Sequence, residues 1–441
     1  MDITTEQNFM GSEKIGKILA KIAPPVMLAQ LIQALYGIID SYFVGRFDSE
    51  ALTALAVIFP VQWLISGFAI GTGVGVNTYM ARQYAYQKTD EANHTAGAGA
   101  VLAIITWALF TMVAVLAMEP FVQSSVTSLQ ATNYAVTYGR IVCIGGLAAF
   151  LEANWTKAHQ SRGNMRLPMI AQIVGALVNV ILDPIFIFGW GFVPQMGVAG
   201  AAYATVIGQI AAAMITVRGA WCKPPVMKEI TGYVKKIYFF GYSSILMQSL
   251  YPVYIVILNM ILAGFSDAAV TVLGLYYKVQ SFFFIPLLGL QTCIVPVLSY
   301  NFAGASYERC RKTMTTSFLI SGVFMIVGIV CFVFFPDKVI GLFTQDAAVL
   351  GIGQVAFPII GCGFIGAVFS LITPVFFQAI GKGMICVLLS LTRQIFCLVP
   401  LFWIFSRIGL NYAWLAFPVS ETIAGSIGYF LYYKQIKQWQ K

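Results

Sequence analysis

Charged residues are scarce in this chain. Only 10% of its 441 residues are Asp, Glu, Lys or Arg, whereas 59% are hydrophobic and the mean hydropathy is +0.82. Soluble domains carry roughly 25% charged residues. This scarcity excludes an ordinary water-soluble protein, because its core could not absorb so much apolar surface. We therefore expect most of the chain to lie in a lipid bilayer.

Histidine and the motifs of enzymatic sites are also scarce. The chain has two histidines, His94 and His159, and it lacks an HExxH sequence, a DDxxD pair and a Walker A loop. The run GTGVG at Gly71–Gly75 lies inside an apolar span, where small residues let helices approach closely. The eight cysteines show no CxxC or metal-ligand spacing. We therefore predict a protein that is not an enzyme and has no cofactor.

A cleavable secretory signal is missing as well. The first residues, MDITTEQNFMGSEK, lack a basic n-region and a small-residue cleavage site, so we expect the first span to be retained. The net charge of +9 could indicate a nucleic-acid partner in a soluble protein. In a membrane protein it indicates cytoplasmic loops beside anionic lipid. We predict the lipid bilayer and small molecules as partners, no nucleic acid, and a monomer.

Apolar stretches long enough to cross a bilayer, about 20 residues each, are abundant. Polar breaks and Gly or Pro residues divide the chain into twelve of them. In the first half they are 18–44, 52–80, 96–117, 134–158, 167–190 and 198–217. In the second half they are 237–263, 272–300, 314–335, 351–379, 384–405 and 414–433. The fold class that we predict is an all-α integral membrane protein with twelve transmembrane helices.

Lys and Arg are distributed unevenly over the connections between these spans. Twenty of the 26 lie in the N-terminal segment, the C-terminal segment and the even-numbered connections. The other connections hold only Arg46, Lys338 and Arg407, while Arg140, Lys278 and Arg393 fall within spans. By the positive-inside rule, this predicts a multi-pass protein of the plasma (inner) membrane with both termini in the cytoplasm.

The two halves of the chain resemble each other at one constant offset. Tyr36 pairs with Tyr254, Gln62 pairs with Gln280, and QSRG at 160–163 pairs with QAIG at 378–381, all at the same separation. Because each half has six spans, an even number, the repeats are parallel and pseudo-symmetric. We predict an N-terminal lobe over 1–220, a cytoplasmic connection over 221–236 and a C-terminal lobe over 237–441.

Two aspartates lie within apolar spans, Asp40 near the end of the first and Asp183 near the end of the fifth. At 1.5 Å per residue they lie about 6 and about 10 Å below the outer ends of their spans. Asn179 lies one turn beneath Asp183, Tyr36 lies one turn beneath Asp40, and Thr205 of the sixth span reaches a similar depth. A carboxylate in a membrane helix costs several kcal/mol and suggests a functional site.

Two neighbouring carboxylates at low dielectric do not both ionise without a cation. We therefore predict that Asp40, Asp183, Asn179 and Thr205 form a coupling site for H⁺ or Na⁺. If the ion is Na⁺, its ligands come from Asp40, Asn179 and Asp183. The alternative for both aspartates is a structural one, in which they cap a helix or pair with a basic side chain.

The second half has no matching carboxylate, because Leu258 stands at the position of Asp40. Its spans carry instead Lys278, Arg393 and Glu421, and Glu421 could neutralise Arg393. Candidate residues for a substrate cavity are Tyr36, Gln33, Lys278, Gln280 and Arg393.

Three stretches resemble the multidrug and toxic compound extrusion (MATE) transporters: LYGIIDSYFVGRFDSEALTALAVIFP, GFAIGTGVGVNTYMARQYA and LVNVILDPIFIFGWGFVPQMGVAGAAYATVIGQ. The acidic residue at position 40 is similar to that of the DinF-type branch. The resemblance implies two six-helix lobes and cation-coupled efflux of drug-like, often cationic compounds. It also implies that Asp40, Asn179 and Asp183 bind the cation or proton, together with the helix-six threonine, here Thr205.

The function that we predict is secondary active multidrug efflux in exchange for H⁺ or Na⁺, by alternating access. The alternative is a flippase for a lipid-linked sugar or a related amphiphile, which basic residues in a central cavity would favour. Lys278 and Arg393 are a hint of this kind.

Overall fold

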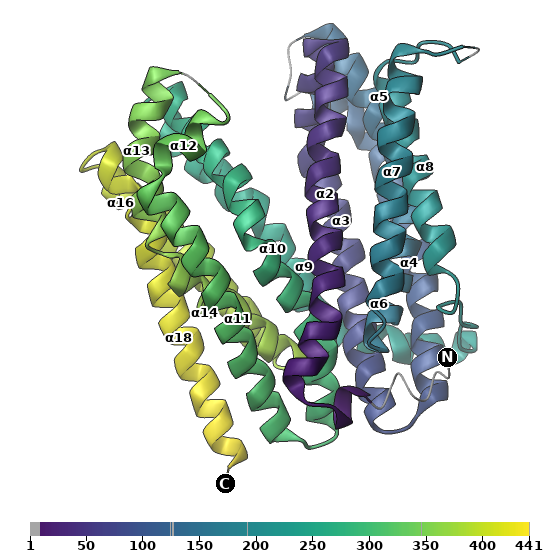
Figure 1. The fold of residues 1–441 in the computed structure, drawn as a ribbon. Coiled ribbons are helices and arrows are strands. Elements are labelled where there is room, and N and C mark those ends of the chain that lie inside the picture. The colour runs from purple at the N-terminus through teal and green to yellow at the C-terminus, as the bar shows by residue number, and fades with distance from the viewer. Residues whose placement is uncertain (1–8, 124, 126–127, 192, 345, 441) are drawn as a thin grey trace. The chain divides into compact units, whose positions relative to one another are not determined.

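The computed structural model describes residues 9–123, 125, 128–191, 193–344 and 346–440. Its elements are almost all helices (Figure 1). The helices of the first half are α2 (Ile15–Phe47), α3 (Ser49–Ala85), α4 (Thr89–Gln123), α5 (Leu129–Gly145), α6 (Leu147–Ser161), α7 (Arg166–Phe188) and α8 (Val198–Thr216).

The second half begins with the long helices α9 (Met227–Ala263), α10 (Asp267–Ala303) and α11 (Tyr307–Phe334). The remaining elements are α12 (Pro336–Gly341), α13 (Ala347–Gly361), α14 (Phe364–Ala379), α15 (Gly383–Leu391), the π-helical turn η1 (Thr392–Leu398), α16 (Val399–Ser406), α17 (Leu410–Ala413) and α18 (Ala416–Trp439).

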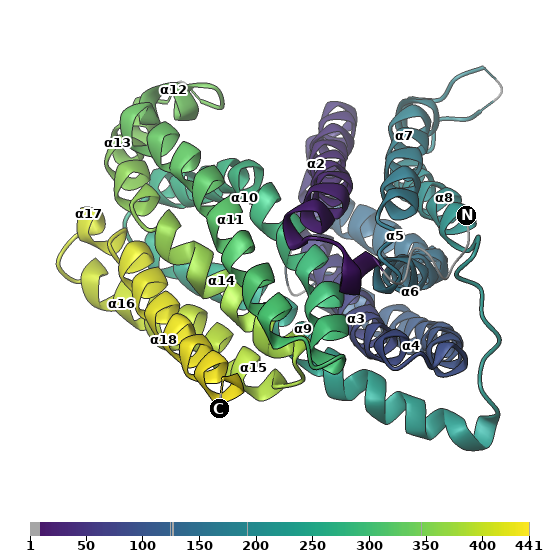
Figure 2. The same cartoon turned by 60° about the horizontal axis from the view of Figure 1, so that its bottom comes forward.

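The helices group into two compact units. Of the described residues, the first unit contains 24–248 and the second contains 9–23 and 249–440. In the first unit α7 packs along α8, and α3 packs on α4, α5 and α6. In the second unit α14 runs beside α18 and α10 runs beside α11, as Figures 1 and 2 both show.

The predicted membrane spans coincide with helices of the structure. Among the described residues, nine helices are long and apolar enough to cross a bilayer, with α15, η1 and α16 counted as one. The fourth and tenth spans are bent pairs, α5 with α6 at 47° and α13 with α14 at 54°. The twelfth span is α18, which is less apolar because it carries Glu421 and several Gly and Tyr residues. The predicted all-α, twelve-span fold is confirmed.

The repeat is visible in the backbone. Asp48 caps α3, and Ser266, its equivalent at the repeat offset, caps α10, each with a side-chain oxygen that accepts a backbone N–H. Gln87 and Ala305, which are also equivalent positions, both have a positive φ, at 59° and 55°. The same local conformations therefore begin and end equivalent helices in the two halves.

The two units fill their cores differently. Small residues such as Ala51 and Ala201 are fully buried in the first unit. In the second unit the largest buried side chains are aromatic, with Phe332 stacked on Phe357 at a centroid distance of 4.9 Å.

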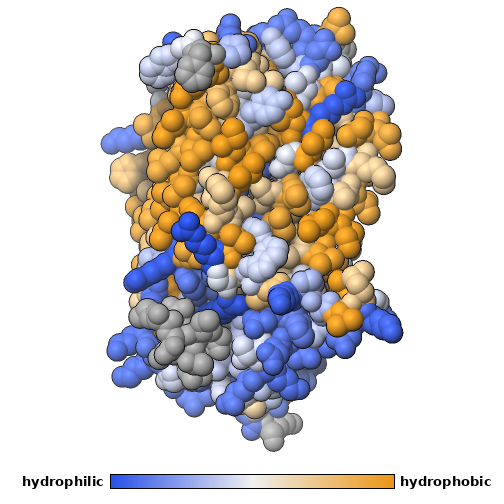
Figure 3. Space-filling view, turned by 90° about the vertical axis from the view of Figure 1, so that its right-hand side faces the viewer, coloured by the Kyte–Doolittle hydropathy of each residue, from blue (hydrophilic) through white to orange (hydrophobic). Residues whose placement is uncertain are grey.

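The outer surface of the helices is apolar. Large side chains such as Leu116 of α4 and Met214 of α8 are exposed. Figure 3 shows an apolar band between hydrophilic ends on one face of the molecule. An extended apolar surface of this kind matches a bilayer environment.

The glycine run in α3 performs the role that its sequence predicts. A Cβ at Gly71 would collide with Ile245, and one at Gly75 would collide with the carbonyl of Ile237. Both partners lie in the first half of α9, which belongs to the first unit. The glycines therefore let α9 pack against α3.

Candidate cation site in the first unit

Close packing of α7 on α8 brings the polar residues of the fifth and sixth spans together. A Cβ at Gly175 would lie 2.9 Å from the carbonyl oxygen of Gly208, and one at Gly208 would lie 2.6 Å from that of Gly175. Two glycines facing each other therefore allow the backbones to approach. One turn beyond Gly175, this contact places Asn179 beside Thr205.

Asn179 links the two helices by hydrogen bonds. Its amide is satisfied in the orientation in which Nδ2 donates to Oδ2 of Asp183 at 3.2 Å. In that orientation its Oδ1 accepts the backbone N–H of Thr205, also at 3.2 Å. Asp183 is fully buried and Asn179 is 3% exposed. The amide thus holds the Asp183 carboxyl group on the face of α7 that packs inside the unit.

Asp40 of α2 completes the arrangement. Its carboxyl group lies at hydrogen-bonding distance from that of Asp183. Ionised carboxylates only accept hydrogen bonds, so the two can bond only when one carries a proton. Oδ1 of Asp40 is buried and accepts no hydrogen bond from the residues that the structure describes. The structure therefore brings together all four predicted residues, which we call the carboxylate cluster: Asp40, Asn179, Asp183 and Thr205.

The carboxylate cluster suits a small hard cation or a proton by its chemistry. Carboxylate, amide and hydroxyl oxygens are the ligand types that such cations prefer. The orientation of Asn179 turns its N–H₂ group toward Asp183, so its oxygen is not available to a cation there. A shared proton fits this arrangement without rearrangement, whereas a Na⁺ ion would require the amide to turn.

Tyr138 of α5 and Gln62 of α3 adjoin the cluster and were not predicted. The Tyr138 side chain is buried, and its hydroxyl accepts a hydrogen bond from Nε2 of Gln62 at 3.3 Å. The same hydroxyl lies near Thr205 and within electrostatic range of Asp40. The Gln62–Gln280 pair of the repeat was a signal for Gln62, whereas the sequence around Tyr138 gave none.

The candidate cavity residues do not form one group. Tyr36 is half-buried and lies within electrostatic range of both aspartates. Gln33 and Lys278 are exposed, and Gln280 is buried. Arg393 is bound to Glu421, with Nε and Nη2 at 2.9 and 2.7 Å from Oε1. The predicted neutralisation of Arg393 by Glu421 is confirmed.

A family model described as MatE matches this chain twice, over residues 25–185 and 243–404. The second match begins at the position that the internal repeat makes equivalent to the start of the first. Together the two matches cover most of the chain.

Curated relatives align over nearly the whole chain at low identity. An FAD transporter of Shewanella oneidensis is 24% identical over 433 residues, covering 95% of each chain. A multidrug export protein MepA of Staphylococcus saprophyticus is 21% identical, covering 94% of this chain and 93% of its own. These similarities identify transporters among the relatives.

Solved structures of the same fold cover 98% of this chain and 98% of their own. A MOP superfamily transporter from Pyrococcus furiosus has a TM-score of 0.91 at 22% identity. A MATE protein in a straight conformation has a TM-score of 0.90 at 22% identity. At these identities the likeness shows the fold, two lobes of transmembrane helices.

Proposed function

This chain belongs to the MATE family of membrane transporters, and from that premise we propose that it exports drug-like, cationic compounds in exchange for H⁺ or Na⁺ by alternating access. The observation that carries the proposal is the carboxylate cluster, in which two buried carboxyl groups face each other and one oxygen of Asp40 has no donor among the described residues. A buried site of this kind binds a positive charge when it is exposed to one.

The coupling ion that the cluster favours is the proton. The Asn179 amide already donates a hydrogen bond to Asp183. A single proton shared between the carboxyl groups of Asp40 and Asp183 then lets these two groups bond to each other. One charge that moves through 100 mV supplies about 2.3 kcal/mol. The import of one or two protons is therefore sufficient to drive export against a concentration gradient.

The sequence supports the proposed membrane location, lobe boundaries and partners. The Lys and Arg distribution supports a plasma (inner) membrane location with both termini cytoplasmic. The repeat supports six-helix lobes over 1–220 and 237–441, joined by the connection 221–236. The protein acts as a monomer without a cofactor or nucleic acid. The names of its relatives, a multidrug export protein and an FAD transporter, support small-molecule export.

The flippase alternative depends on the basic residues of the second unit. It requires free basic residues in a central cavity, whereas Arg393 is neutralised by Glu421. Lys278, the other candidate, is exposed on α10, so it alone keeps the flippase as the second candidate.

The test of the proposal is Asp40→Asn, with ethidium efflux measured in cells. We expect efflux to fall at least about tenfold while the amount of membrane-inserted protein stays unchanged, because the amide cannot take up the coupling proton. Asp48→Asn is the matched control. Asp48 caps α3 by accepting the Glu50 N–H at 2.9 Å, and asparagine caps helices equally well. If Asp40→Asn retains wild-type efflux, the coupling role of the cluster is wrong.

The ion is tested by transport in proteoliposomes in which the proton and sodium gradients are dissipated separately. We expect a protonophore to stop uptake of ethidium, and removal of the Na⁺ gradient to leave it unchanged. The reverse result would assign the cluster to Na⁺, with ligands from Asp40, Asn179 and Asp183.

A further inference from the structure

The first unit contains a small cavity between α3, α4 and α6. It offers about 10 Å³ of room to a water-sized molecule, and one bound water needs roughly 10 to 15 Å³. Half of the residues that line it are Ala or Gly, and its polar side chains are those of Thr72, Thr106 and Asn154. The cavity therefore has the size of a single water molecule and polar groups to hold one.

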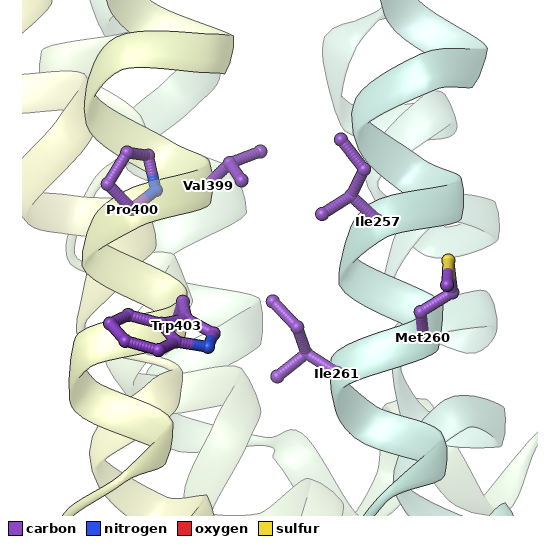
Figure 4. Close-up of a pocket in the computed structure, with 6 residues that line it drawn as sticks. All are labelled: Ile257, Met260, Ile261, Val399, Pro400 and Trp403. Atoms are coloured by element: carbon purple, nitrogen blue, oxygen red, sulfur yellow. The ribbon is translucent and has the colours of Figure 1, made fainter.

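A larger pocket, in the second unit, has a different wall (Figure 4). It measures about 510 Å³ and lies between α9 and α16, where Ile257 and Val399 extend toward each other. All six of its lining residues are hydrophobic. Such a wall selects no particular ligand, whereas polar atoms in the wall of the small cavity do.

Two buried oxygens in the wall of the small cavity have no hydrogen-bond partner in the described part of the chain. They are Oγ1 of Thr72, a residue that is 6% exposed, and Oδ1 of Asn154, a residue that is 3% exposed. The other end of the Asn154 amide is bonded, since its Nδ2 donates to the carbonyl of Ala96 at 3.2 Å. A buried polar group without a partner destabilises a protein. Both oxygens therefore require a partner that the cavity can hold.

Glycines in α3 and α4 make room for these oxygens. A Cβ at Gly99 of α4 would collide with Oδ1 of Asn154. A Cβ at Gly73, the neighbour of Thr72 in the GTGVG run, would collide with Lys157 of α6. The glycines thus let the three helices approach closely enough for one small molecule to contact both Thr72 and Asn154.

The repeat shows that packing does not require polar side chains at these positions. Leu290 and Ile372 are the equivalents of Thr72 and Asn154 at the repeat offset, and both are fully buried in the second unit. An apolar pair of similar shape can replace a buried polar pair with little loss of stability. The polar pair of the first half therefore indicates a bound polar molecule.

Water fits this cavity better than an ion does. None of the eight lining residues is charged, so a bound ion would have no balancing charge at low dielectric. A water molecule can donate to Oδ1 of Asn154, accept from the hydroxyl of Thr72 and bond to the hydroxyl of Thr106. Three hydrogen bonds are the usual number for a buried water.

We propose that this cavity binds one water molecule, which bridges Thr72 of α3 and Asn154 of α6. Because Asn154 also bonds to α4, the water completes a link among three helices. Thr72 and Asn154 lie about 12 and about 6 Å from the inner ends of their predicted spans, so the link stabilises the inner part of the first unit. The proposal is independent of the export function, since none of its tests measures transport.

The direct test is the density of the full chain, by crystallography or cryo-electron microscopy at a resolution that shows ordered water. We expect a peak about 2.8 Å from both Oγ1 of Thr72 and Oδ1 of Asn154. The peak should persist in Thr72→Ser, which keeps the hydroxyl, and disappear in Thr72→Val, which replaces the hydroxyl with a methyl group. A wild-type map that shows other buried waters but no peak in this cavity would overturn the proposal.

The thermal unfolding of purified Thr72→Val gives an independent test, because the sign of the shift depends on the water. If water is bound, valine removes one end of the bridge, and we expect the unfolding midpoint to fall by about 2 to 4 °C. If the cavity is dry, valine replaces a hydroxyl that has no partner, and the midpoint should stay or rise. The second result contradicts the proposal.

Thr78→Val is the matched control for this measurement. Thr78 also lies on α3 and is fully buried, and its hydroxyl has no partner among the residues that the structure describes. It does not line the cavity, so its replacement by valine should not lower the midpoint as Thr72→Val does. Equal losses in the two variants would show that the cavity is not the cause.

The double substitution Thr72→Val with Asn154→Leu copies the apolar pair of the second half. Each single substitution breaks the bridge and leaves one oxygen without a partner, whereas the double substitution removes both oxygens. We therefore expect the midpoint of the double variant to lie above the value that the sum of the two single shifts predicts. Strict additivity would show that no molecule connects the two residues.

Discussion

At the scale of single residues, Tyr138 connects the carboxylate cluster to the rest of the first unit. Its hydroxyl accepts a hydrogen bond from Gln62 at 3.3 Å and lies near Thr205 and Asp40. A hydroxyl both donates and accepts, so it can adjust when the charge of the neighbouring carboxyl pair changes. This makes Tyr138 a positioning residue for the cluster.

The substitution Tyr138→Phe tests this role. We expect ethidium efflux to fall about threefold to tenfold, because one hydrogen bond worth about 1 kcal/mol is removed next to the cluster. The thermal unfolding of the purified protein should change little, since the ring stays in place. Tyr134→Phe is the control, because the Tyr134 hydroxyl bonds to Gln130 at 3.1 Å on an exposed surface. Equal efflux by the two variants would contradict the role of Tyr138.

The sequence was sufficient to predict Asp40, Asp183, Asn179 and Thr205 as neighbours, because depth along a helix and i, i+4 spacing follow from helix geometry. The sequence did not predict Tyr138 as a neighbour of these residues. Tyrosine is common in membrane helices, and its contact with Thr205 depends on how α5 packs against α8. Similarly, the sequence does not predict the contacts of Arg393, because they depend on the π-helical turn η1 in which it lies.

At the scale of helices, facing glycines decide how closely α7 and α8 approach. Gly175 and Gly208 lie against each other's carbonyl groups, and Gly208 also lies against Asn179. The same principle holds α3 against the first half of α9. Since backbone atoms cannot move aside as a flexible side chain can, a methyl group there must separate the helices.

Gly175→Ala is therefore expected to destabilise the protein by about 1 to 3 kcal/mol and to reduce efflux, because it displaces Asn179 from Thr205. Gly37→Ala in α2 is the matched control, since a Cβ there meets nothing within 4 Å. It should leave stability unchanged or raise it by up to about 1 kcal/mol, because alanine favours the helix. Thermal unfolding of both purified variants checks this. A lower midpoint for Gly37→Ala than for Gly175→Ala would refute the argument.

Helix existence was predictable, but some details of helix shape were not. Hydropathy and charge located all twelve spans, although several helices extend past the predicted ends, as α9 does by beginning at Met227 rather than at 237. The bends at Gly146 and at Cys362–Gly363 were missed, because each bent span reads as one continuous apolar stretch. The π-helical turn was also missed, although it ends just before Pro400, whose missing N–H interrupts the helical hydrogen bonds.

At the scale of the whole molecule, the repeat is preserved in the backbone while its chemistry has diverged. Caps and positive-φ residues recur at equivalent positions of the two halves, as Gly163 and Gly381 do with φ of 82° and 85°. The carboxylates of the first unit have no counterpart, because Leu258 stands at the position equivalent to Asp40 and Leu401 at the position equivalent to Asp183. Shared backbone geometry with divergent side chains therefore confines the proposed coupling site to the first half.

The parallel repeat makes a prediction about topology. Each half has six spans, so equivalent residues of the two halves must lie on the same side of the membrane. We expect alkaline phosphatase, which folds only where disulfides form, to be inactive when fused after either Gly163 or Gly381. It should be active when fused after Gln195 or Ile408, because they follow the fifth and eleventh spans, which we predict to run outward. The enzyme activity of whole cells, normalised to the amount of fusion protein, measures the result. Opposite activities at Gly163 and Gly381 would require an odd number of spans per repeat, and hence an inverted repeat. Leu258 would then no longer be the equivalent of Asp40.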